Sequence, residues 1–185
     1  MSAAVPLDSA PEGVVFSGSR RGGAVKTYLI SWLRKNHATH RLEQFERLRV
    51  GPWLVWEAGP WRPPSARRET LQAGPNTRLL ASGESLAIEL TAKDGGAEIR
   101  LGRDADCDLV IDDATLSRIH LVLRRDAAGA WTGQDAGSRN GTRIDGAPAT
   151  MPLPLREGSV IEAGAVRLTF YRAAGLFARL RAPTP

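Results

Sequence analysis

The second half of the chain, from Thr77 to Ala173, consists of short apolar segments separated by turn-forming residues. Apolar and polar positions alternate with the period of two that is typical of strands, most clearly in SLAIELTA and VRLTFYR. Groups such as KDGG, DAAGA, SRNG and REG separate the segments and favour turns. The pattern predicts strands within residues 79–92, 97–102, 108–111, 119–125, 130–135, 142–145, 159–163 and 166–172. Because no helical period interrupts them, we predict a mainly β protein with a β-sandwich over residues 77–173.

The region before this sandwich has a different pattern. Apolar side chains recur every three or four positions in residues 25–33 and again in residues 42–48, and this predicts two helices. The segment GPWLVWEAGPWRPP follows, and it predicts a hairpin rich in tryptophan. We therefore expect a small helical N-terminal region with a hairpin over residues 14–64, either as a separate unit or as a cap on the sandwich. The remaining segments are expected to be a flexible tail (1–13), a linker (65–76) and a C-terminal tail (174–185).

Composition and charge exclude several kinds of chemistry. Hydrophobic residues make up 42% of the chain, and its net charge is +5, with the positive excess in residues 1–76 and not in the predicted sandwich. Cys107 is the one cysteine, so this chain has no internal disulfide and no cysteine-based zinc cluster. The segment GSRRGGAVKT does not match a phosphate-binding loop, because Ala24 and Val25 separate its glycines from Lys26. No catalytic set of side chains stands out, and we expect no enzyme activity, metal or cofactor.

The turns between the predicted strands carry donors that suit an anion. Arg103 ends a strand, Ser117 follows the loop IDDATL, and Ser138-Arg139-Asn140 form a turn with Gly141. A phosphate dianion is bound best by charge-assisted hydrogen bonds from a guanidinium and by hydroxyl or backbone N–H donors. Because loops of a sandwich converge at its ends, we expect these donors to lie close together.

The order of these residues resembles the forkhead-associated (FHA) domain family, whose members are β-sandwiches that bind phosphothreonine peptides. The family pattern is Gly-Arg, then Ser-x-x-His, Asp, Ser-x-Asn-Gly-Thr and later glycines. The matching positions are Gly102-Arg103, Ser117 to His120, Asp135, Ser138 to Thr142, Gly158 and Gly164. The resemblance covers residues 77–173 and implies an FHA-like β-sandwich there, preceded by the N-terminal extension.

The resemblance also implies roles for individual residues. Arg103 and Ser117 would bind the phosphate, and Asn140 would hold the ligand backbone. The whole phosphopeptide-binding set is Arg103, Ser117, Arg118, Ser138, Arg139 and Asn140. The set with a structural role is Gly102, His120, Gly141 and Thr142.

These observations predict a non-catalytic adaptor in Ser/Thr kinase signalling or assembly, which binds a phosphothreonine-containing protein after an upstream Ser/Thr kinase has modified it. A cytoplasmic location is expected, because there is no signal-peptide pattern and no apolar run of the ~18 residues that a membrane span needs. Nucleic acid is not the expected partner. Two alternatives remain. One is a DNA-binding regulator in which residues 24–62 resemble a truncated winged helix, and the other is a phosphate-independent scaffold in a secretion or envelope complex.

A further hypothesis concerns Thr70. The segment Arg67-Arg68-Glu69-Thr70 resembles substrates of basophilic kinases. Phosphorylated Thr70 would then bind to the chain's own phosphate site or to that of a second molecule.

Overall fold

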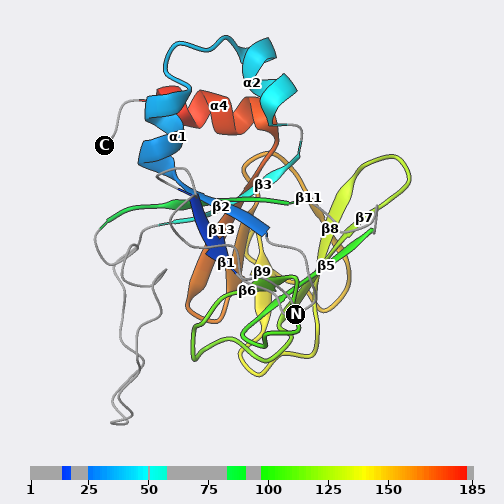
Figure 1. Ribbon diagram of the computed structural model, residues 1–185. Coiled ribbons are helices and arrows are strands. Elements are labelled where there is room, and N and C mark those ends of the chain that lie inside the picture. Colours follow the sequence, from blue (N-terminus) through cyan, green and yellow to red (C-terminus); the bar gives the residue numbers. More distant parts are fainter. Residues whose placement is uncertain (1–13, 18–24, 50, 58–82, 91–96, 183–185) are drawn as a thin grey trace, which may run out of the picture.

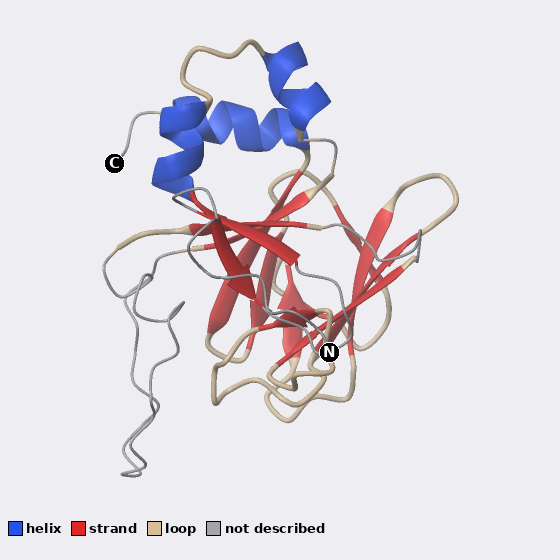
Figure 2. Ribbon diagram, viewed as in Figure 1, coloured by secondary structure: helices blue, strands red, loops and turns tan. Residues whose placement is uncertain are grey.

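Two β-sheets and a group of three helices make up the part of the chain that the computed structural model describes, which is residues 14–17, 25–49, 51–57, 83–90 and 97–182 (Figures 1 and 2). The larger sheet has the strand order β1 (Val14–Ser17), β2 (Val25–Leu29), β4 (Leu86–Glu89), β3 (Trp53–Trp56), β13 (Val166–Tyr171), β12 (Val160–Ala163), β9 (Thr142–Ile144) and β10 (Ala147–Pro148). The smaller sheet has the order β11 (Leu153–Leu155), β8 (Trp131–Asp135), β7 (Leu121–Arg125), β5 (Glu98–Gly102) and β6 (Leu109–Val110). The mainly β fold predicted from the sequence is confirmed, and each predicted strand segment contains a strand.

The two sheets pack face to face around the main hydrophobic core. Inward-facing side chains of both sheets form this core, among them Leu54, Leu101, Leu121 and Phe170, each at most 1% exposed. Neighbouring strands are antiparallel except for β5 and β6, which run parallel. The short parallel strand β6 follows the loop after Gly102, so this loop lies at the end of the smaller sheet.

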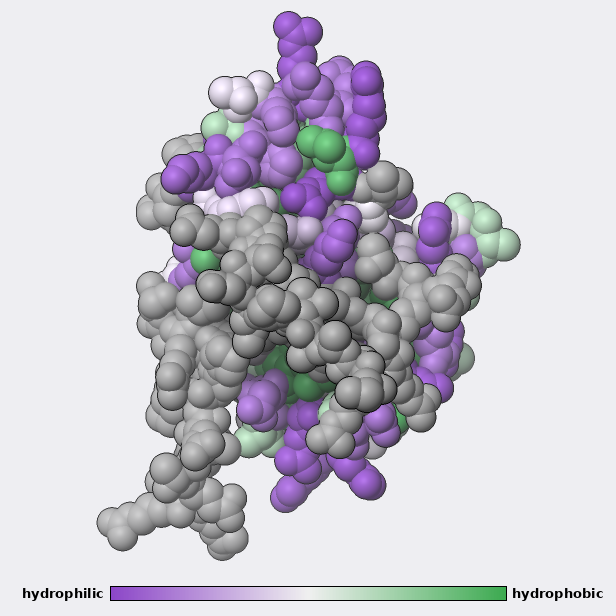
Figure 3. Space-filling model, viewed as in Figure 1, coloured by the Kyte–Doolittle hydropathy of each residue, from purple (hydrophilic) through white to green (hydrophobic). Residues whose placement is uncertain are grey.

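The helices form a cap on the outer face of the larger sheet. They are α1 (Ile30–Asn36), α2 (Leu42–Leu48) and α4 (Ala173–Arg181), and Figure 1 shows them together at one end of the molecule. A second hydrophobic core joins them to the sheet through Leu33, Phe45 and Phe177. We call the three helices the helical cap. Its outward surface is mostly hydrophilic in the view of Figure 3.

The predicted tryptophan-rich hairpin is wrong, because strand β3 pairs within the larger sheet. It pairs with β4 on one side and β13 on the other, so neither edge is free for a hairpin partner. Trp53 and Val55 pack against the helical cap, while Leu54 and Trp56 pack into the main core. All four side chains are buried because both faces of the strand are covered. Strands β1, β2 and β3 of the N-terminal region are therefore part of the larger sheet, and the boundary predicted at residue 77 lies outside the described residues.

The predicted helix over residues 25–33 is also corrected. Residues Val25–Leu29 form β2, which pairs with β4, and the helix begins only at Ile30. Val25, Thr27 and Tyr28 favour strands, and pairing with a central strand outweighs the helical spacing of the apolar residues. The helix–helix–hairpin unit of the DNA-binding alternative is therefore not present in residues 25–57. The predicted helix at 42–48 coincides with α2.

The predicted C-terminal tail instead begins with α4. Leu176, Phe177 and Leu180 are buried against α1 and α2. The Arg181 guanidinium donates to the carbonyls of Ala38 and His40, at 3.0 Å each. These contacts hold the end of the chain on the helices that come from its beginning.

Some predicted segments fall outside the described residues, namely the tail over 1–13 and the linker over 65–76 with Thr70. Within the described residues, no helix is long and apolar enough to cross a membrane.

Phe45→Ala is expected to destabilise the whole described fold and not the helical cap alone. Phe45 is fully buried, with its ring centroid 5.3 Å from that of Phe177 and 4.9 Å from that of His37. The lost packing should lower the free energy of unfolding by about 3–5 kcal/mol, measured by urea denaturation. The control is Leu48→Ala, because Leu48 lies in the same helix but is 60% exposed. This substitution should change the free energy of unfolding by less than about 0.5 kcal/mol. Unfolding of the helical cap in a separate, earlier transition would contradict the conclusion that the cap and the larger sheet share a core.

Candidate functional site

The loops that carry the predicted site residues are joined through the buried side chain of His120. The backbone N–H of Ser117 donates to Nδ1 of this ring at 3.0 Å, and Nε2 lies 3.1 Å from the carbonyl oxygen of Gly141. Because Nδ1 accepts, the ring proton is on Nε2 and is donated to Gly141. The ring is fully buried. His120 therefore holds the loop before β7 against the loop before β9.

Asp135 shapes the second of these loops from within. Its carboxylate accepts hydrogen bonds from the hydroxyls of Ser138 and Thr142, at 2.6 Å each, and from the backbone N–H groups of Gly137 and Ser138. Burial alone would raise the pKa of Asp135, but these hydrogen bonds outweigh it and hold the pKa below its ordinary value of 3.8. The turn of residues 137–142 is thus built around one ionised carboxylate.

Gly102 allows the end of β5 to lie directly on the backbone of the loop before β7. A Cβ atom on Gly102 would lie 2.1 Å from the carbonyl oxygen of Arg118. The next two residues continue the contact, because the N–H groups of Arg103 and Asp104 donate to the carbonyls of Ser117 and Arg118, at 3.1 Å each. A glycine is required here for this close approach, and it brings Arg103 beside Ser117.

Thr115 lies in the loop before β7. It connects this loop to the loop before β9 and to the turn between β12 and β13. Its hydroxyl accepts the N–H of Ala165 at 2.8 Å, and its carbonyl accepts from the side-chain amide of Asn140 at 2.7 Å. Gly164 packs against Thr115 so closely that a Cβ atom would lie 2.5 Å from the threonine hydroxyl oxygen. The sequence prediction missed Thr115, because the family pattern does not include it.

A cavity of about 640 Å³ opens where these loops meet, and we call it the basic cavity. Its lining residues are Arg100, Arg103, Asp104, Asp106, Ser117, Arg118, Ile119, Gly137 and Arg139. Four arginines and two aspartates are thus among the lining residues, which carry an excess of positive charge. Arginine keeps this charge at any working pH.

Ser117 is arranged to donate a hydrogen bond into the basic cavity. Its hydroxyl oxygen accepts the backbone N–H of Arg139 at 2.9 Å. The described residues offer no acceptor for the hydroxyl proton, so it can be donated to a ligand. Arg139 is thereby held at the rim of the cavity.

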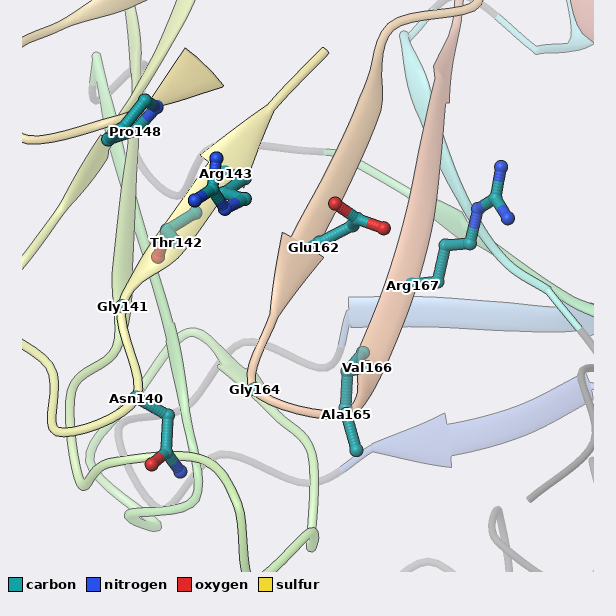
Figure 4. Close-up of a pocket in the computed structure, with 10 residues that line it drawn as sticks. All are labelled: Asn140, Gly141, Thr142, Arg143, Pro148, Glu162, Gly164, Ala165, Val166 and Arg167. Atoms are coloured by element: carbon teal, nitrogen blue, oxygen red, sulfur yellow. The ribbon is translucent and has the colours of Figure 1, made fainter. Parts of the chain in front are cut away.

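Asn140 borders a second hollow beside the basic cavity, a groove of about 490 Å³ (Figure 4). It runs from Asn140 and Gly141 over the outer face of β9, β12 and β13. Figure 4 shows Arg143, Glu162 and Arg167 projecting from these three strands, where Glu162 stands opposite both arginines in the strand register. One amide N–H of Asn140 is used by Thr115, so its oxygen and its other N–H are available at the head of the groove.

The predicted site residues thus fall into three groups. Arg103, Ser117, Arg118 and Arg139 line the basic cavity, and Asn140 lies at the head of the adjoining groove. The hydroxyl of Ser138 donates to Asp135 and accepts the N–H of Gly141, so it supports the turn, and its contact with a ligand stays a prediction. The residues with a predicted structural role, Gly102, His120, Gly141 and Thr142, all lie in the contacts that join the loops.

Sequence reasoning missed Arg100 as a cavity residue. The alternation in AEIRLG places its side chain outward, on the same strand end as Arg103, and this signal was available in the sequence. Arg100 shares Glu98 with Arg124, with nitrogen–oxygen distances of 3.0 and 3.1 Å.

Cys107 lies beneath the loop before β7. Its thiol donates to the carbonyl of Arg118 at 3.1 Å, and burial, together with the charges of Asp104 and Asp108, raises its pKa. The side chain is inert and supports the loop.

Comparison with known proteins agrees with this architecture. The sequence model of the FHA domain family matches residues 99–164 of this chain. The glycogen accumulation regulator GarA of Mycolicibacterium smegmatis is 32% identical over 98 residues, which cover 49% of this chain and 61% of GarA. The oxoglutarate dehydrogenase inhibitor of Corynebacterium glutamicum is 30% identical over 108 residues, which cover 55% of this chain and 74% of the inhibitor.

The solved structures that this chain resembles include two of low sequence identity. Mycobacterium tuberculosis EmbR, in complex with a low-affinity phosphopeptide, is 23% identical, and the alignment covers 67% of this chain and 25% of EmbR with a TM-score of 0.46. An FHA domain from Chlamydia trachomatis is 17% identical, with 65% of this chain and 97% of that domain covered and a TM-score of 0.44.

The sandwich with its joined loops is of the class that presents a binding site on loops at one end. The family match and the relatives of at least 30% identity identify it further: the chain belongs to the FHA domain family. The matched part spans about three fifths of the length of GarA.

Asp135→Asn is expected to destabilise the fold at neutral pH by about 1–3 kcal/mol, because hydrogen bonds to a charged acceptor are replaced by weaker ones. The folded-state pKa of Asp135 lies below 3.8, so its contribution is present above pH 3.8 and is lost as the pH falls below that value. Urea denaturation of both proteins should therefore give a difference at pH 7 that shrinks towards pH 3. A difference that is the same at both pH values would refute the charged network.

Proposed function

We propose that this protein is a phosphothreonine-dependent binding module that acts as an adaptor in Ser/Thr kinase signalling or assembly. The observation that carries the proposal is the basic cavity, in which Arg103 and Ser117 lie together on two loops that are clamped to each other. A phosphate dianion would meet a guanidinium, a hydroxyl proton and further positive charge in one place. Membership of the FHA family supports this ligand class.

Each predicted contact has a geometric basis. Arg103 would bind the phosphate through its planar fork, and Ser117 would donate its free hydroxyl proton. Arg118 and Arg139 would add charge from the rim of the cavity. Asn140 would bind the ligand backbone where the basic cavity meets the groove, and residues on one side of the phosphothreonine would follow the groove of Figure 4.

Preorganisation of the site supports a binding role. The loops are joined by His120, Asp135 and Thr115, so little ordering remains for the moment of binding. The lining residues offer donors and fixed charge, which bind a phosphate ester without attacking it. A kinase would thus control the interaction by adding the phosphate, and the bound partner would be brought to this chain.

Arg103→Ala is expected to weaken the binding of a phosphothreonine peptide by about 100-fold or more, because two charge-assisted hydrogen bonds are lost. Fluorescence anisotropy of a labelled peptide selected from a phosphopeptide library measures this change. The matched control is Arg156→Ala, which removes the same charge from an exposed position that lines neither the cavity nor the groove, and it should bind within about twofold of the unmodified protein. Equal binding of the unphosphorylated peptide would rule out the proposed function.

A further inference from the structure

We propose that Ile119 is a specificity-determining residue, which binds an apolar side chain of the ligand close to the phosphothreonine. The inference rests on the proposed function and narrows its ligand class to phosphothreonine peptides with an apolar neighbour. It starts from the one large apolar side chain that lines the basic cavity.

Ile119 differs from the other exposed large apolar residues of the described chain in its position. It is 41% exposed and lines the basic cavity, next to Arg118. Leu48 in α2 and Met151 between β10 and β11 are 60% and 71% exposed, but neither lines the basic cavity or the groove. Single exposed apolar side chains are common on protein surfaces. The location of Ile119 inside a binding cavity gives it a role that the other two do not have.

The backbone on both sides of Ile119 is fixed. The carbonyl of Arg118 accepts the N–H of Asp104 at 3.1 Å, and the N–H of His120 donates to the carbonyl of Leu101 at 2.8 Å. Gly102 packs so closely that a Cβ atom on it would lie 3.0 Å from the Cα of Ile119. A β-branched side chain has few rotamers. Ile119 therefore presents a nearly rigid apolar surface, and little conformational entropy is lost when a ligand covers it.

The chemistry of this surface selects an apolar partner. Covering Ile119 with an apolar side chain removes hydrocarbon from water on both sides of the contact, and the aliphatic stem of Arg118 can extend the patch. A polar side chain placed there would lose water and gain no hydrogen bond from Ile119. Because Ile119 shares one cavity with Arg103 and Ser117, the apolar ligand residue must lie within about three positions of the phosphothreonine.

The experiment uses the full chain and a set of phosphothreonine peptides in which leucine or serine occupies each of the three positions on either side of the phosphothreonine. We expect leucine at one position to strengthen binding to the unmodified protein by about five- to tenfold relative to serine. In Ile119→Ala this gain of the leucine peptide over the serine peptide should fall to less than about twofold. Met151→Ala, which removes a more exposed apolar side chain outside the cavity, should keep the full gain.

The outcomes separate this inference from the proposed function. Phosphate-dependent binding without any leucine gain, or with a leucine gain that Ile119→Ala retains, overturns the role of Ile119 and leaves the proposed function intact. The same peptides with phosphoserine test whether Ile119 contacts the methyl group of the phosphothreonine instead. If Ile119→Ala loses the preference for phosphothreonine over phosphoserine and keeps the leucine gain, the inference is also wrong. Failure of every phosphopeptide to bind overturns both. Residue 119 is exposed at the surface, so Ile119→Ala should have a melting temperature within about 2 °C of that of the unmodified protein.

Discussion

The whole candidate site depends on one buried imidazole. His120 accepts a hydrogen bond from the backbone of the loop before β7 and donates one to the backbone of the loop before β9. A buried backbone group that lost its partner would be left unsatisfied, so the ring both positions the loops and prevents them from separating. Ser117 and Arg139 line one cavity because these loops are held together, and the close approach at Gly102 brings Arg103 beside Ser117. The hydrogen bonds of Asp135 and Thr115 extend the same arrangement to the turns on either side.

The second constraint is the shared larger sheet. β3 lies between β4 and β13, and its four side chains are divided between the two hydrophobic cores. The helical cap therefore adds a second layer to the sandwich, and helices from both ends of the chain cover the same face. The ion pair of Glu57 with Arg179, at 2.6 Å, and the contacts of Arg181 hold this layer together. In Figure 1 the cap lies at the opposite end of the sandwich from the green and yellow loops that form the site. The helical cap therefore does not cover the basic cavity.

The basic cavity and the groove suit different parts of one peptide. Fixed positive charge and a free hydroxyl proton in the cavity match a phosphate, whereas Asn140 offers a donor and an acceptor to a backbone. Ile119 adds a rigid apolar contact within the cavity. Affinity would then come mainly from the phosphate, and selectivity among phosphopeptides from its neighbours.

Local patterns in the sequence determined most strands of residues 86–171, the helix α2 and four of the residues that line the basic cavity, namely Arg103, Ser117, Arg118 and Arg139. A strand has a period of two, and the donors lie in turns that glycine and asparagine favour, so neighbouring residues suffice to predict both. The pairing of β2 and β3 within the sandwich was decided only by tertiary structure. Their apolar residues fit a helix or a hairpin equally well, and burial on two faces depends on strands and helices that are distant in the sequence. The same holds for the hydroxyl of Ser138, whose hydrogen bonds with Asp135 and Gly141 are fixed by the folded turn. Contacts between distant segments decide such questions, because a side chain's role depends on which groups surround it in the folded chain.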